Sequence, residues 1–197
     1  MKVLLLYIFS FILGGVPFGY LIGKYIYNVD IRSKGSGNIG ATNVFRTLGT
    51  VPGLVVFATD LLKGAIPVFI GRAMGLPREL FLLAGALSVL GHCFSPFLGF
   101  KGGKGVSSTY GMMLAFDPVV AILSLLVEGG FIAIWGYVSL GSIASVICMV
   151  LFLIVRGHNL FSILIMALTA LLIIIRHKDN IKRLLEGKEN RFTLKGH

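Results

Sequence analysis

The stretch from Val3 to Gly23 reads VLLLYIFSFILGGVPFGYLIG and contains no charged residue. A helix needs about 20 such residues to cross the hydrocarbon core of a bilayer, which is roughly 30 Å thick. The apolar run is long for a signal peptide and no small-residue A-x-A cleavage site follows it, so we expect a retained membrane helix. The first span is predicted over residues 3–26.

The rest of the chain repeats this pattern. Of its 197 residues, 56% are hydrophobic and only 13% are charged, and its mean hydropathy is +0.91, which is too apolar for a water-soluble domain. The sequence therefore predicts an all-α integral membrane protein: a single domain over residues 1–197, built as a bundle of about seven transmembrane helices. Apolar runs predict the six later spans at 51–70, 80–97, 104–116, 118–137, 140–155 and 160–175. The fourth run reaches only about 20 Å as a helix, so we expect it to be short, tilted or re-entrant.

Basic residues set the expected orientation. With seven spans, most of the 18 Lys and Arg residues fall on one side, and only Lys2, Arg72, Arg78 and Arg156 fall on the other. Because basic loops stay in the cytoplasm, the N-terminus is predicted on the outer side of the membrane and the C-terminus on the cytoplasmic side. The membrane is predicted to be the cytoplasmic (inner) membrane. Residues 176–197 should form a basic tail that continues the last helix. The loops after the first and third spans, the Ser-rich turn before the sixth and this tail should then meet at one cytoplasmic face.

The first of these loops, residues 35–46, reads GSGNIGATNVFR. It contains G-x-G-x-x-G, but it follows a membrane span instead of a strand, so it does not indicate a dinucleotide site. Small residues still allow backbone N–H groups to turn toward one anion, and the polar side chains add donors. The candidate residues here are Ser36, Gly37, Asn38, Gly40, Ala41, Thr42, Asn43 and Arg46.

The second loop, residues 100–109, reads FKGGKGVSST and lacks the spacing of a Walker A motif. It places Lys101, Gly102, Gly103 and Lys104 at a predicted helix start, where amide groups favour an anion. Topological anchoring is the competing interpretation for both lysines. Two further elements contribute single candidates, namely Ser142 in the third loop and, in the tail, His177 and Asn180.

Polar residues inside the spans have open roles. Asp60 and Lys63 are three residues apart, so an ion pair within one helix or a place in a substrate pocket are equally good interpretations. His92 and Glu128 are interpreted as packing or hydrogen-bonding residues. Gly15, Gly19 and Gly23 repeat every four residues, which favours close helix packing within the bundle over a dimer interface.

The missing residue types restrict the chemistry. None of the eight acidic residues lies in the two Gly-rich loops, which disfavours a metal-dependent phosphoryl-transfer centre. No G-x-S-x-G elbow is present, and Cys93 and Cys148 lie within apolar runs, so no covalent nucleophile stands out. We therefore expect neither a metal nor a cofactor. The donors suit phosphate binding and oxyanion stabilisation, for a reaction whose electrophile arrives already activated.

Four segments carry a family resemblance: GSGNIGATN at 35–43, FKGGKGV at 100–106, the turn at 138–142 and RHKDNIKR at 176–183. Together they resemble the bacterial acyl-phosphate:glycerol-3-phosphate acyltransferases. The resemblance implies transfer of a fatty acyl group from acyl phosphate to the 1-hydroxyl of glycerol 3-phosphate, giving lysophosphatidic acid and phosphate. It implies no acyl-enzyme intermediate and no metal. The chain departs from the family at Ser107–Ser108, where Ala-Thr is frequent, and at Gly136, where a basic residue is frequent.

The resemblance also assigns roles and partners. It implies four catalytic residues, Ser36, Asn38, Lys104 and His177, with the other candidates binding the two substrates. The proton of the attacking hydroxyl goes either to His177 or to the departing phosphate. Expected partners are both substrates, the bilayer and the enzyme that makes acyl phosphate, with no nucleic acid. The alternative function is a transporter or channel for a phosphorylated anionic solute, which requires polar residues through the bilayer.

Overall fold

The computed structural model describes residues 1–191, and within them the chain is entirely helical and loop, as predicted. Ten α-helices and two short 3₁₀ helices follow one another: α1 (Lys2–Gly15), α2 (Phe18–Ile26), η1 (Ile31–Ser33), α3 (Ala41–Leu48), α4 (Thr50–Ala73), α5 (Arg78–Cys93), η2 (Pro96–Leu98), α6 (Val106–Phe116), α7 (Pro118–Trp135), α8 (Val138–Val155), α9 (Leu160–Arg176) and α10 (Lys178–Leu185).

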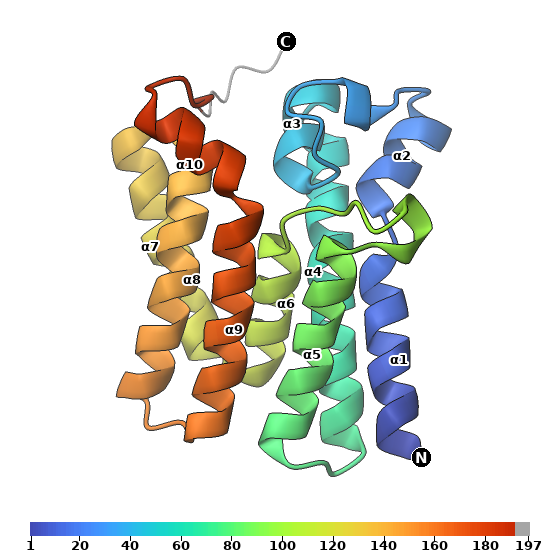
Figure 1. Ribbon diagram of the computed structural model, residues 1–197, viewed down its shortest axis with the longest axis vertical. Coiled ribbons are helices and arrows are strands. Elements are labelled where there is room, and N and C mark those ends of the chain that lie inside the picture. Colours follow the sequence, from blue (N-terminus) through green and yellow to red (C-terminus); the bar gives the residue numbers. More distant parts are fainter. Residues whose placement is uncertain (192–197) are drawn as a thin grey trace.

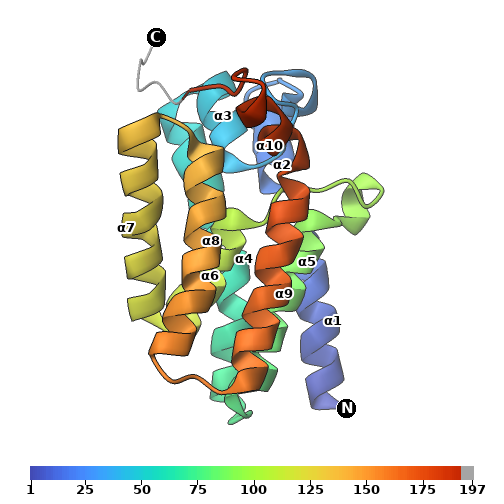
Figure 2. The same ribbon diagram turned by 60° about the vertical axis from the view of Figure 1, so that its left-hand side comes forward.

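The long helices run side by side, up and down one bundle (Figure 1). Short helix α6 lies inside it and contacts α4, α5 and α7, while α9 packs against α5 and α8. The main apolar core lies among these helices and includes Leu82, Met112, Met149 and Ile173. Both views place α3 and α10 together at the end of the bundle opposite the N-terminus (Figures 1 and 2). Two of the four segments expected to share one face, the first Gly-rich loop with α3 and the tail with α10, therefore do so.

Four helices in the described residues are long and apolar enough to cross a membrane, namely α4, α5 with its extension to Leu98, α7 and α8. The bent pairs α1–α2 and α9–α10 raise the total to six. All seven predicted spans are helical, but α6 has only 11 residues. It is the short fourth segment that the sequence predicted.

The first span differs from the continuous helix expected over residues 3–26. It breaks at Val16–Pro17, where α1 and α2 meet at 42°. Pro17 has no N–H to donate to the carbonyl four residues earlier, and its ring clashes with that carbonyl, so a regular helix cannot continue through it. Side chains bind carbonyls at the break: Ser95 Oγ donates to the Gly15 oxygen at 2.6 Å, and Lys63 Nζ donates to the Val16 oxygen at 3.0 Å.

The sequence predicts that the tail continues the last helix, but the structure shows a break between them. The chain bends by 58° between α9 and α10, at His177. The Ile173 carbonyl accepts the His177 backbone N–H at 3.0 Å and lies 2.8 Å from the His177 ring. Beyond the bend, Asn180 of α10 accepts from Lys104, in the loop before α6, and donates to Glu189, and these contacts hold α10 away from the axis of α9. Residues 192–197 of the predicted tail lie outside the described residues.

Two predicted loops are more helical than expected. Helix α3 begins at Ala41, inside the first Gly-rich loop, and α8 begins at Val138, so Ser142 is a helical residue. The turn before α8 is confined to Gly136 and Tyr137, with Gly136 in the left-handed region at φ +77°. The short amphipathic helix α3 lacks the long apolar run from which the membrane helices were predicted.

The glycine repeat packs within the bundle, which confirms that interpretation. A Cβ on Gly15 would overlap Pro96, one on Gly19 would overlap the Ile39 carbonyl, and one on Gly23 would approach Ile31. Helix α2 therefore lies directly on the segment that leads into α3.

Candidate active site

A cavity of about 380 Å³ opens at the end of the bundle that holds α3 and α10. Of the fifteen site residues predicted from the sequence, all but Gly37, Lys101, Gly102 and Gly103 line it. The structure thus brings together four segments that are far apart in the sequence. The predicted residues at the cavity wall are Ser36, Asn38, Gly40, Ala41, Thr42, Asn43, Arg46, Lys104, Ser142, His177 and Asn180.

The first Gly-rich loop is organised around the buried side chain of Asn43. Its Oδ1 accepts from the Ser36 backbone N–H at 2.8 Å, and its Nδ2 donates to the carbonyls of Ile31 (3.0 Å), Lys34 (3.1 Å) and Asn38 (2.8 Å). Because these contacts use both amide hydrogens and the oxygen, Asn43 holds the loop in shape. The hydroxyl of Ser36 and the side chain of Asn38 are left at the cavity wall.

The start of α3 faces the same cavity. Asn38 Oδ1 accepts from the Gly40 N–H at 2.9 Å, which fixes the turn immediately before Ala41 and Thr42. The first N–H groups of a helix have no partner within it and carry the positive end of the helix dipole. This helix start therefore offers backbone donors to an anion.

The second loop is fixed from two sides. The N–H groups of Gly102 and Gly103 donate to the carbonyls of Cys93 (3.2 Å) and His92 (3.0 Å) at the end of α5. Their own carbonyls accept from the Arg176 guanidinium at 2.7 and 3.1 Å. Neither glycine has space for a Cβ. Both glycines therefore lie behind the cavity wall and position the residue that follows.

That residue is Lys104. Its Nζ donates to Asn180 Oδ1 at 2.5 Å, across 76 positions of sequence. Burial lowers the pKa of Lys104 to about 8, because the charged ammonium is partly removed from water. Lys101, by contrast, is exposed and does not reach the cavity.

His177 lies beyond the end of α9 and is 2% exposed. Its Nδ1 lies 2.8 Å from the Ile173 carbonyl, which can only accept, so Nδ1 carries the proton. The neutral ring then has an unprotonated Nε2. Burial, and next the charge of Lys104, lower the pKa of His177 to about 4.

Glu189 belongs to the site and was missed by sequence analysis. This buried carboxylate accepts from Ser139 at 3.0 Å, from Asn180 at 2.7 Å and from Arg183 at 2.7 Å. Burial opposes its ionisation, but these hydrogen bonds and the Arg183 charge together lower the pKa of Glu189 below its ordinary value. The only sequence signal was an acidic residue within a basic tail.

The other part of the cavity wall is largely apolar. It includes Phe57, Leu125 and Ile132 beside the buried Glu128, whose carboxylate accepts from Ser142 Oγ at 2.7 Å. Ser142 thus bonds to Glu128 in this structure. The cavity therefore has a cationic, donor-rich part next to a surface suited to a hydrocarbon chain.

Fold and site together define a class: a helical integral membrane protein with one cavity that is cationic and donor-rich on one side and apolar on the other. The comparisons with known proteins give the family. Residues 4–187 match the family model described as glycerol-3-phosphate acyltransferase. The chain is 46% identical over 193 residues to the glycerol-3-phosphate acyltransferase of Aquifex aeolicus, covering 98% of this chain and 100% of that one. It is 42% identical over 189 residues to the enzyme of Carboxydothermus hydrogenoformans, covering 96% of each chain.

Solved structures agree. The chain is similar to crystal structures of PlsY, an integral membrane glycerol 3-phosphate acyltransferase. Against the glycerol 3-phosphate form the TM-score is 0.94 at 44% identity, covering 98% of this chain and 96% of that one. Against the lysophosphatidic acid form it is 0.92 at 43% identity, covering 98% and 97%. The chain therefore belongs to the glycerol-3-phosphate acyltransferase family, and it is an acyltransferase of the membrane.

Proposed function

We propose that this acyltransferase moves a fatty acyl group from acyl phosphate to the 1-hydroxyl of sn-glycerol 3-phosphate at the cytoplasmic face of the inner membrane. The hydroxyl oxygen attacks the acyl carbonyl, the bond from that carbon to the phosphate oxygen breaks, and the products are lysophosphatidic acid and inorganic phosphate. The reaction uses no acyl-enzyme intermediate and no metal.

One observation carries this proposal: the donor-rich and the apolar parts belong to a single cavity. In this proposal Arg46, Lys104 and Asn180, which line the cavity, bind the phosphate of glycerol 3-phosphate. Ser36 and the start of α3 bind the donor phosphate and the oxyanion that forms on the acyl carbonyl. The acyl chain extends along Leu125 and Ile132 toward the bilayer.

The choice of donor follows from the nucleophiles that the site lacks. Cys93 is buried in the apolar core, and among the described residues the Ser36 hydroxyl has no base as a hydrogen-bond partner. Ser142 does donate to the carboxylate of Glu128, but a carboxylate is a much weaker base than an imidazole and activates a serine hydroxyl poorly. A mixed anhydride such as acyl phosphate already has a good leaving group, so direct attack by the second substrate suffices. The relatives named above are glycerol-3-phosphate acyltransferases, which favours acyl transfer over the transporter alternative.

The test is incubation of the purified protein with palmitoyl phosphate and glycerol 3-phosphate. We expect equimolar release of phosphate and a product with the mass of palmitoyl lysophosphatidic acid. Palmitoyl-CoA serves as the comparison donor, and the 1-deoxy analogue of glycerol 3-phosphate serves as the comparison acceptor. Product formed from palmitoyl-CoA but not from palmitoyl phosphate would overturn the choice of donor, and acylation of the 1-deoxy analogue would overturn the choice of hydroxyl.

Transport is tested separately in proteoliposomes. Without an acyl donor, labelled glycerol 3-phosphate should not accumulate inside vesicles that contain the protein faster than in protein-free vesicles. Uptake that depends on the protein would support the transporter alternative.

A further inference from the structure

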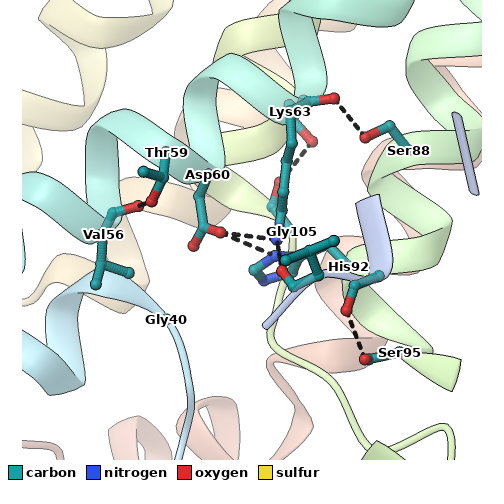
Figure 3. A network of polar contacts seen from close by, with 12 residues as sticks. Gly40, Val56, Thr59, Asp60, Lys63, Ser88, His92, Ser95 and Gly105 are labelled. Carbon is teal, nitrogen blue, oxygen red and sulfur yellow. Dashed lines mark hydrogen bonds and ion pairs between the residues drawn. The ribbon is translucent and has the colours of Figure 1, made fainter. Parts of the chain in front are cut away.

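Asp60, Lys63 and His92 form a buried cluster of ionisable residues (Figure 3). Two of them, Asp60 and His92, line the cavity. Asp60 Oδ1 lies 2.7 Å from Lys63 Nζ and 3.6 Å from His92 Nδ1. The three residues are only 2%, 2% and 4% exposed. None of them has a role in the reaction proposed above.

An ion pair within α4 does not account for this cluster. Burying charges is expensive, and a buried pair is often no more stabilising than apolar residues of similar size. In membrane proteins such residues mark functional positions. The contacts of Lys63 and His92 with neighbouring segments indicate what the function is.

The first contact leads to the second Gly-rich loop. The His92 carbonyl accepts from the Gly103 N–H at 3.0 Å, and the His92 ring occupies the space that a Cβ on Gly103 would need. The next residue is Lys104, which binds Asn180 across the cavity. The orientation of the His92 ring therefore limits where Lys104 can lie.

The second contact leads to the first Gly-rich loop. Lys63 Nζ donates to the Val16 carbonyl at 3.0 Å, at the break between α1 and α2. Helix α2 begins two residues later, and its Gly19 packs against the Ile39 carbonyl just before α3. The position of the helix break therefore supports the loop that precedes α3.

We propose that Asp60, Lys63 and His92 form a positioning cluster that fixes the two Gly-rich loops relative to each other. Asp60 joins the two halves, since its carboxylate faces both the ammonium of Lys63 and the ring of His92. The residues touch no reacting atom. The identity of the two anions held by the loops rests on the proposed function, but the geometry of the cluster does not.

A double-mutant cycle tests the His92 half. His92→Ala should lower kcat/KM for glycerol 3-phosphate by about tenfold to a hundredfold, because small misplacements of binding groups have effects of this size. If His92 acts through Lys104, the same substitution in a Lys104→Ala protein should change kcat/KM less than about threefold. The assay uses whichever acyl donor the wild-type protein turns over, so failure of the acyl phosphate proposal would leave this test intact.

A matched control lies at the opposite end of the bundle. His158 Nε2 is 2.9 Å from the buried carboxylate of Asp117, so His158→Ala also removes a histidine–carboxylate contact. It should lower thermal stability while leaving kcat/KM in the wild-type range. A loss for His92→Ala that is undiminished in the Lys104→Ala background would show that His92 acts independently of Lys104 and overturn the proposal.

Two further variants keep the test decisive if His92→Ala does not fold. His92→Asn retains a donor near the Nδ1 position but removes the ring from Gly103, and it should reproduce the cycle. The paired variant Asp60→Asn with Lys63→Met removes both buried charges together. Wild-type kcat/KM in this pair would mean that the cluster only neutralises itself, whereas a persistent loss with restored folding would support the positioning role.

Discussion

The Lys104 ammonium bonds directly to the side-chain oxygen of Asn180 at 2.5 Å, joining the loop before α6 to helix α10. The same Asn180 donates its amide to Glu189 at 2.7 Å. The cationic part of the cavity is thus held by three segments that come together only in the folded bundle. Its lysine is oriented by a neutral partner, so most of its charge remains available to an anion.

Replacing Lys104 by Ala should remove a charge-assisted contact with a substrate phosphate. Such contacts contribute about 1.5 to 3 kcal/mol, which corresponds to a loss of about tenfold to more than a hundredfold in rate. Steady-state kinetics of the folded variant measure this loss. Near wild-type turnover would mean that Lys104 serves only as a topological anchor.

The same lysine predicts a pH dependence. Its pKa of about 8 means that the charged form is lost as the pH rises through that value. Affinity for glycerol 3-phosphate should therefore be constant between about pH 7 and 8 and then fall by up to tenfold per pH unit, until the higher pKa of the anion-bound lysine is passed. The KM measured from pH 7 to 10 tests this expectation.

The control is Lys104→Arg, which stays charged throughout and should show a flat profile of KM against pH, even if its turnover is slower. An equally steep rise of KM in Lys104→Arg would assign the titration to another group.

Acyl transfer should be insensitive to a metal chelator. The carboxylates at the cavity wall are engaged by protein groups: Glu189 by Ser139, Asn180 and Arg183, Glu128 by Ser142, and Asp60 by Lys63. Turnover should be unchanged by EDTA. A loss of turnover in EDTA that Mg²⁺ restores would contradict the metal-free mechanism.

Cysteine labelling tests the orientation. Ser33, Pro77 and Asn190 are exposed. Ser33 precedes α3 and Asn190 follows α10, the two helices at the end of the bundle that carries the cavity, whereas Pro77 belongs to the connection between α4 and α5 at the opposite end (Figure 1). In a protein with Cys93 and Cys148 replaced, cysteines at positions 33 and 190 should react with an impermeant thiol reagent only from the cytoplasmic side. A cysteine at position 77 should react only from outside. Labelling of positions 33 and 77 from the same side would show that α4 does not cross the membrane between them and would overturn the seven-span prediction.

The long helices were predictable because apolar runs report directly on burial in lipid. Helices α4, α7 and α9 begin and end within three residues of the predicted bounds. The bends at Pro17 and His177 were not predictable from hydropathy, since both stretches remain apolar or amphipathic through the break. Each bend depends on partners far away in sequence, such as Lys63 for the carbonyl at the first break.

The candidate site was predictable where a residue is both polar and set among glycines, as Ser36 and Lys104 are. The sequence did not predict which of these residues bond within the protein and which face the cavity. Asn43 donates to carbonyls of its own loop region, those of Ile31, Lys34 and Asn38. The glycines at 102 and 103 pack behind Lys104, because their N–H groups donate to carbonyls at the end of α5. Glu189 could not be found, since nothing in its local sequence shows that Ser139 and Asn180 lie beside it.

The proton of the attacking hydroxyl distinguishes two mechanisms that use the same residues. A general base works best when its pKa is near the operating pH, whereas burial and Lys104 lower the pKa of His177 to about 4. The ring is oriented by the carbonyl of Ile173, which stabilises the charged imidazolium less than a carboxylate would. Both features favour proton transfer to the departing phosphate, with His177 positioning glycerol 3-phosphate.

His177→Gln decides between these mechanisms, because glutamine can hydrogen-bond but is no base near neutral pH. If the leaving phosphate takes the proton, the variant should retain substantial kcat with a raised KM, and the pH profile of kcat from 5.5 to 9 should keep its shape. If His177 is the base, kcat should fall by about 10² to 10⁴. Asn180→Ala is the matched control, since Asn180 shares the cavity but cannot accept a proton, and it should raise KM in either case. A collapse of kcat at unchanged KM for His177→Gln alone would establish histidine as the general base.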